Sequence, residues 1–144
     1  MVVIVMIRIG LQFSVVCEWS DGNNMRDIIN GFTPGKIKQF HVVNKWFWEE
    51  VEKRVLNFKI ETGGYYQETY IIESSSQSKD KVIAFSRSDR FRVKNSHTHN
   101  NCFQDINFCQ GNNYRVSVVL FDSNDETVES GSIEYPLFVR EVGN

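Results

Sequence analysis

Residues 5–19, VMIRIGLQFSVVCEW, alternate between apolar and polar side chains over about two ordinary strand lengths. Their odd positions carry only Val, Ile, Leu, Phe, Cys and Trp. The even positions from Arg8 to Glu18 are polar or glycine except for Val16. Because successive side chains of a strand point to opposite faces, the pattern predicts one long strand, bent near Gly10, with its odd positions facing the core.

The same segment resembles a secretory signal peptide that ends at a lipidated cysteine. However, no Lys or Arg precedes the apolar run, Arg8 interrupts it, and no small-residue cleavage site follows it. The run is also shorter than the roughly 20 residues that a membrane-spanning helix requires. We therefore expect it to be part of the fold and expect no membrane span.

The composition favours strands throughout the chain. There are 17 Val and 12 Ile against 4 Leu and one Ala, and β-branched residues suit sheets whereas Ala and Leu suit helices. A length of 144 residues fits one domain spanning 1–144. With 16 Lys and Arg against 18 Asp and Glu, the charge argues against a general nucleic-acid binder.

Further segments extend this interpretation. Met25, Ile28, Ile29 and Phe32 have helical spacing between an Asn cap and Gly31, which predicts a short helix. Residues 54–61 and 65–73 alternate on either side of a Gly-rich turn and predict a hairpin. Residues 81–88, 89–94, 114–121 and 127–142 predict further strands, of which the first two could be one strand with a bulge near Ser88 and Asp89. Pro136 predicts that the last strand lies at a sheet edge or is broken there.

Together these segments predict an all-β antiparallel β-sandwich. We expect seven to nine strands with one or two short helical turns, in either an immunoglobulin-like or a jelly-roll arrangement.

The closing segment, residues 114–138, contains NYRVSVVLFD, an acidic turn, and then GSIEYPLF. It resembles the final hairpin of many immunoglobulin-like modules. It is also similar to the end of the SKICH domains of autophagy and phosphoinositide-phosphatase adaptors. This resemblance supports the fold class, and no functional residue is carried over from it.

Residues 97–109, HTHNNCFQDINFC, supply four weak candidates for metal ligation: His97, His99, Cys102 and Cys109. Asn and Ser in this stretch favour turns, and the two cysteines are seven apart, whereas zinc sites usually pair cysteines two to four apart. We therefore interpret the stretch as a polar connector without a metal. A disulfide between Cys102 and Cys109 and a metal site remain as alternatives.

No motif for catalysis or cofactor binding is found. The sequence has no nucleophile elbow, phosphate-binding loop, dinucleotide fingerprint or zinc-protease motif. We expect no cofactor and no enzymatic activity.

Two groups of residues are candidates for binding. Arg90, Arg92 and Lys94 alternate with apolar residues and would share one strand face, either as an anion contact or as an ordinary solvated face. Trp46, Phe47 and Trp48 lie beside charged residues. If exposed, a cluster of this kind suits a protein interface or sugar stacking, whereas buried Trp46 and Trp48 would be ordinary core residues.

Three functions are consistent with these features. The leading hypothesis is a non-catalytic recognition or assembly module that acts through protein–protein contacts, with another protein or with itself. The alternatives are a viral jelly-roll structural or accessory protein and a carbohydrate-binding module. The odd number of cysteines and the absence of any N-x-Ser/Thr site favour an intracellular location over a secreted or virion-associated one.

Overall fold

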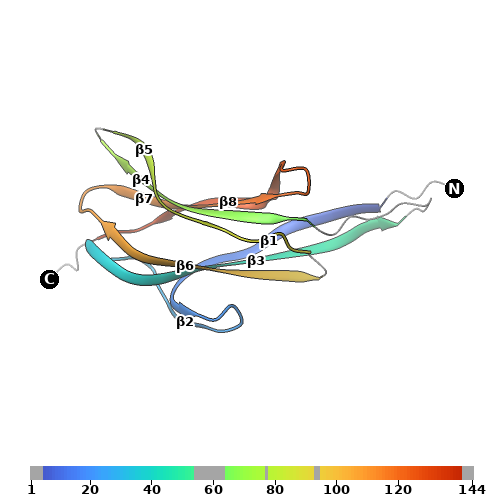
Figure 1. Ribbon diagram of the computed structural model, residues 1–144, viewed down its shortest axis with the longest axis horizontal. Coiled ribbons are helices and arrows are strands. Elements are labelled where there is room, and N and C mark those ends of the chain that lie inside the picture. Colours follow the sequence, from blue (N-terminus) through green and yellow to red (C-terminus); the bar gives the residue numbers. More distant parts are fainter. Residues whose placement is uncertain (1–4, 54–63, 77, 93–94, 141–144) are drawn as a thin grey trace.

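The computed structural model describes residues 5–53, 64–76, 78–92 and 95–140. Eight strands form two antiparallel sheets of four strands that pack face to face (Figure 1). The strands are β1 (Val5–Ser20), β2 (Met25–Ile28), β3 (Gly35–Lys53), β4 (Tyr66–Ser75), β5 (Ser78–Arg87), β6 (Ser96–Phe108), β7 (Asn113–Phe121) and β8 (Thr127–Leu137). The predicted all-β antiparallel sandwich is confirmed.

The strand order is β2-β1-β3-β6 in the first sheet and β5-β4-β7-β8 in the second. β8 is therefore an edge strand, and it continues through Pro136 to Leu137, so of the two alternatives that Pro136 predicts the edge position is found. The first run of the predicted hairpin, residues 54–61, lies outside the described residues. Its second run forms β4, which pairs with β5 and β7.

The described residues contain no helix, so the predicted short helical turns are wrong. The helix expected near Met25 is instead β2, which pairs with the end of β1. The carboxylate of Asp21 accepts hydrogen bonds from the backbone N–H groups of Asn23 and Asn24, which closes a tight turn before β2. All four β2 side chains are exposed, so the apolar spacing here does not mark a buried helical stripe. The described residues therefore also contain no helix that is long and apolar enough to cross a membrane.

A β-bulge in β1 changes which side chains face the core. The register against β3 shifts between Leu11 and Phe13. Before the shift, Ile9 and Leu11 pack in the core; after it, Val16 does. Because one extra residue reverses the facing of every later side chain, the prediction that the odd positions of β1 all face inward is wrong beyond Leu11.

The bulge places Cys17 on the outer face of the first sheet, opposite His41. Cys17 is nevertheless fully buried there, and burial raises the pKa of its thiol. Earlier in β1, before the bulge, the ring of Phe47 lies directly over Gly10. A Cβ added to Gly10 would come within 2.8 Å of this ring. Gly10 is therefore required for this close contact.

Between the sheets, most buried side chains are apolar. Trp46, Phe40, Phe108, Ile71 and Leu120 are the largest apolar side chains among those that are fully buried. The indole N–H of Trp46 donates to the carbonyl of Gly131 in β8 at 2.8 Å. The largest core side chain is thereby linked to the opposite sheet.

The centre of the sandwich also contains a polar network. The Asn44 amide donates to Gln67 Oε1 at 3.1 Å and to Thr69 Oγ1 at 3.0 Å. The Gln67 amide donates to Asn101 Oδ1 at 3.0 Å, and the Asn101 amide donates to the Val42 carbonyl at 2.9 Å. Asn44 and Asn101 belong to the first sheet and Gln67 and Thr69 to the second, so the network joins the two sheets.

Ser14 and Tyr135 extend this network toward the β1 side. Ser14 donates to Asn44 Oδ1 at 2.7 Å, and its oxygen lies 2.7 Å from the Tyr135 hydroxyl. Because the single hydroxyl hydrogen of Ser14 is already used, Tyr135 is the donor in the second bond. Burial raises the pKa of Tyr135 to about 12, which keeps this hydroxyl protonated.

Gln67→Met tests the energetic role of the network. The substitution keeps the length of the side chain but removes its amide, so Asn101 Oδ1 loses a donor inside the sandwich. We expect unfolding free energy to fall by about 2 kcal/mol, measured by urea denaturation. The matched variant Gln104→Met, at an exposed glutamine of β6, should change it by less than about 0.5 kcal/mol. Equal losses in the two variants would contradict the role assigned to the network.

Candidate functional site

The aromatic residues singled out in the sequence do not form an exposed patch. Trp46 is 0% exposed, and Phe47 is half-buried over Gly10. Trp48 is half-buried and packs against the core. Trp46 is therefore an ordinary core residue, the alternative to an exposed patch, because the even positions of β3 from Phe40 to Trp46 face the opposite sheet.

The stretch from His97 to Cys109 is not a connector. Residues 96–108 form β6, which pairs with β3 in constant register from end to end. Its odd positions, including His97 and His99, share a face with buried Asn101, while exposed Cys102 points the other way. Cys109 follows the end of the strand, and both cysteines are free. Among the described residues, no group of three or more His, Cys, Asp or Glu side chains is placed to hold a metal.

His97 packs against aromatic rings rather than polar groups. Its imidazole stacks on Phe91 with ring centroids 3.7 Å apart and an angle of 8° between the planes. The centroid of the Trp46 ring lies 6.4 Å from that of His97, and the two rings are also stacked. Burial lowers the pKa of His97, and burial is also the main cause of the lowered pKa of His99.

These two histidines predict a pH-dependent stability. Because their pKa is lower in the folded state, the unfolded chain binds more protons below its ordinary histidine pKa of about 6.5. The histidines should therefore not lower the free energy of unfolding above that pH, and this free energy should fall as the pH drops below it. Thermal unfolding across this range measures the effect. His97→Phe keeps the ring stack and should flatten the dependence, whereas an unchanged slope would contradict the assignment to His97.

The structure describes two of the three basic residues singled out in the sequence. Among the described residues of the predicted strand 89–94, only Phe91 makes a bridge, to Tyr65. Arg90 pairs with Asp125 at 2.7 Å and donates to the Gly64 carbonyl at 2.7 Å. Arg92 is exposed, and Lys94 lies outside the described residues. The charge of Arg90 is therefore balanced within the chain.

An aromatic cluster does occur on the outer face of the second sheet. It consists of Tyr66, Tyr70, Phe85 and Phe121, with Val82 beside them, and is called the aromatic face below. Tyr66 stacks on Phe121 with centroids 4.8 Å apart, and Tyr70 packs on Phe85 at 5.3 Å. Both are cross-strand pairs, in which neighbouring strands hold the rings side by side. Phe85 is 50% exposed and Val82 is 51% exposed.

Two guanidinium groups border the aromatic face. Arg87 lies 5.7 Å from the Tyr66 ring and 5.6 Å from the Phe85 ring, and Arg90 lies 4.9 Å from the Tyr66 ring. Beside Tyr66 and these arginines opens a pocket of about 370 Å³ that Asp125 also lines. The aromatic face thus combines flat aromatic rings, two guanidinium groups and a pocket.

Arg87 also holds a buried carboxylate. Its Nε and Nη2 donate to Glu68 Oε1 at 3.0 and 2.6 Å. The Glu68 side chain is only 8% exposed, whereas that of Arg87 is 59% exposed. The pair therefore fixes the guanidinium at the border of the aromatic face while leaving much of it in solvent.

Arg87→Met should destabilise the protein, because it leaves Glu68 without its cation. We expect a loss of about 1–2 kcal/mol, limited by the exposure of Arg87. Arg90→Met is the matched control, since Arg90 and Asp125 are both exposed, and it should cost less than about 0.5 kcal/mol. Chemical denaturation measures both. Adding Glu68→Gln should recover part of the Arg87→Met loss, and no recovery would contradict this account.

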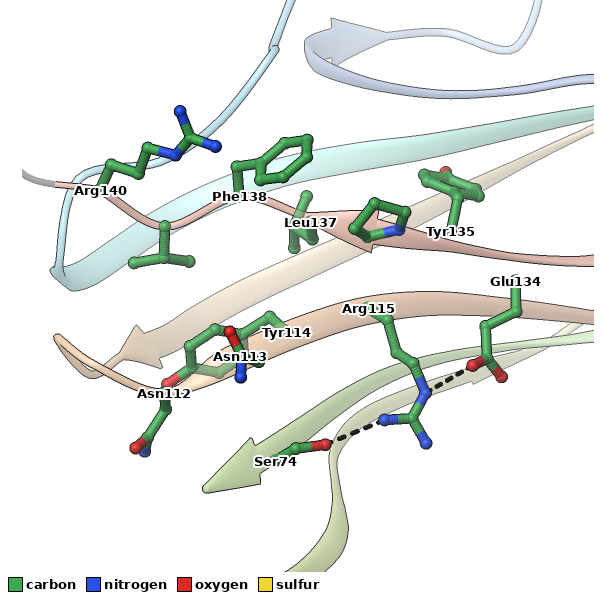
Figure 2. Close-up of a pocket in the computed structure, with 12 residues that line it drawn as sticks. Ser74, Asn112, Asn113, Tyr114, Arg115, Glu134, Tyr135, Leu137, Phe138 and Arg140 are labelled. Atoms are coloured by element: carbon green, nitrogen blue, oxygen red, sulfur yellow. Dashed lines mark hydrogen bonds and ion pairs between the residues drawn. The ribbon is translucent and has the colours of Figure 1, made fainter. Parts of the chain in front are cut away.

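A second pocket, of about 540 Å³, lies beside the ends of β7 and β8 (Figure 2). On one side, Arg115 is paired with Asp80 and with Glu134 and donates to Ser74 at 3.0 Å. On the other, the Arg140 guanidinium lies 4.7 Å from the Phe138 ring. The pocket is large enough for a small ligand, but the charge of Arg115 is already balanced by two carboxylates.

The sequence did contain a signal for the aromatic face. In residues 65–73, YYQETYIIE, the even positions Tyr66, Tyr70 and Ile72 are apolar, although the odd position Ile71 supplies the core. In a two-layer sandwich, one face of each strand meets the core and the other meets solvent. Large apolar side chains on both faces of a strand therefore indicate an apolar surface on the outer side of the sheet.

No protein-family model matches the chain, and no curated protein sequence matches it. The candidate site therefore depends on the geometry described above.

Proposed function

We propose that this chain is a non-catalytic recognition module of immunoglobulin-like topology that binds a protein partner through the aromatic face. The observation that carries the proposal is the pair of cross-strand aromatic contacts, stacked Tyr66–Phe121 and tilted Tyr70–Phe85, bordered by Arg87 and Arg90. Tyr, Phe and Arg are enriched at protein interfaces, and Tyr and Arg are frequent hot-spot residues. Rings held by neighbouring strands lose little conformational freedom on binding.

The strand order supports the immunoglobulin-like alternative. If β3 to β8 are taken as strands B, C, C′, E, F and G, the second sheet has the order C′-C-F-G. The first sheet then contains A, B and E as β1, β3 and β6. In a jelly roll, most successive strands alternate between sheets, whereas here β1–β2, β4–β5 and β7–β8 are neighbours within one sheet. The order therefore does not favour the viral jelly-roll alternative.

A tyrosine contact supports the same assignment. Tyr114, the second residue of β7, is buried, and its hydroxyl accepts a hydrogen bond from the backbone N–H of Cys109 at 2.7 Å. The same hydroxyl donates to Glu73. Immunoglobulin-like sandwiches often carry a tyrosine at the start of strand F that bonds to the backbone a few residues upstream.

The chemistry of the thiols and aromatic residues supports the other parts of the proposal. Burial raises the pKa of the Cys17 thiol, which disfavours the nucleophilic thiolate. Three free cysteines are consistent with an intracellular location. The carbohydrate alternative depended on Trp46 and Trp48 as a stacking platform, and burial of Trp46 weakens it.

A random-peptide display library panned against the protein tests the proposal. Peptides enriched on the unmodified protein should bind Phe85→Glu at least about tenfold more weakly, because the variant places a charge among the rings. Ile133→Glu is the matched control, since Ile133 is 45% exposed but lies on β8, outside the aromatic face. Peptides that bind both variants equally would contradict the proposal. Binding to a glycan array without any peptide enrichment would also contradict the proposal and would support the carbohydrate alternative.

A further inference from the structure

The four edges of the two sheets differ in how they are protected from pairing with other chains. β2 is only four residues long and contains Asp27 in the left-handed region, at φ 58°. β5 carries Lys79, Asp80 and Lys81 and pairs irregularly with β4. β8 contains Pro136 and also has a register shift. Short length, charge, proline and bulges are the usual means of blocking a sheet edge.

β6 lacks these features over most of its length. Residues 96–104, SHTHNNCFQ, include no Lys, Arg, Asp, Glu, Pro or Gly. The strand is 13 residues long, and its pairing with β3 has no register shift. Asp105, at φ 56°, is the only acidic residue and follows this stretch. Among the described residues, none pairs with the other side of β6, so a regular row of backbone groups borders the first sheet.

In immunoglobulin-like folds, a further strand can occupy the position that lies beside β6 in this protein. In constant-type immunoglobulin sheets, strand D lies next to strand E in the order A-B-E-D. Here the described residues between β5 and β6 add no strand to the first sheet, so β6 is an edge strand of that sheet. An added strand there would pair with β6, whose own pairing with β3 has no register shift.

We propose that β6 pairs in antiparallel fashion with β6 of a second copy of this chain. An antiparallel pair of identical strands is related by a twofold axis, which makes the contact self-complementary and closed. Residues 96–104 carry no carboxylate or amine that would repel its own copy. Asn and Gln side chains both donate and accept hydrogen bonds, so the exposed amide of Gln104 is compatible with a second amide-rich edge. The dimer leaves the aromatic face free.

Cross-linking through cysteine tests the geometry. If the pairing is centred on Asn100, the middle residue of 96–104, the two Cys102 residues lie about 15 Å apart and the two Cys109 residues about 60 Å apart. Both thiols are exposed, whereas Cys17 is buried. A bis-maleimide reagent of that reach should join two copies of the protein. The linked dimer should be lost in Cys102→Ser and retained in Cys109→Ser, and the reverse pattern would overturn the proposal.

Sedimentation velocity over a range of concentrations tests the association itself. The protein should form a dimer, and Gln104→Lys should raise the dimer dissociation constant about tenfold, because a lysine on an edge strand disfavours its pairing and the twofold axis places two such lysines in each dimer. Ser130→Lys is the matched control, since it places the same charge at an exposed position of the β8 edge, and it should leave the constant unchanged. A monomer up to the solubility limit, or equal effects of both lysines, would overturn the proposal.

Phe85→Glu separates this inference from the proposed function. It should weaken peptide binding at the aromatic face while leaving the sedimentation behaviour unchanged. Loss of the dimer in Phe85→Glu would overturn the β6 contact as the dimer interface.

Discussion

A continuous set of hydrogen bonds through the middle of the sandwich determines how its two sheets face each other. Asn44, Gln67, Thr69 and Asn101 are all fully buried, and each hydrogen-bonds to another of the four. Apolar packing tolerates small sliding movements between sheets, but a buried amide that loses its partner costs about 1–3 kcal/mol. One relative position of the sheets satisfies these groups, and the surfaces described above depend on that position.

The β1 bulge is the local feature that makes this network complete. Without the extra residue near Phe13, Ser14 would point outward and Asn44 would lose the donor at its Oδ1. The same shift turns Cys17 to the outer face of the first sheet. The bulge thus costs regular pairing but adds a polar link between β1 and the rest of the network.

The two proposed contacts use different parts of the fold and different physical interactions. The aromatic face is a side-chain surface on the second sheet, where Arg87 is fixed by buried Glu68 and the rings are fixed by their neighbours. The outer side of β6 is a backbone surface at the border of the first sheet. A dimer formed through β6 would present two aromatic faces, and two linked sites bind a multivalent partner more strongly than one.

The sequence by itself determined the fold class, because period-2 alternation and the excess of Val and Ile are local properties of strands. It also indicated the edge position of β8 through Pro136. It did not reveal the bulge in β1, the strand at Met25 or the strand character of residues 97–108, where Asn and Ser suggested a turn. In these places pairing with β1 or β3 overrode local preference. Only the tertiary structure decided that Trp46 is buried and Phe85 exposed, because alternation identifies two faces of a strand but not which one meets the opposite sheet.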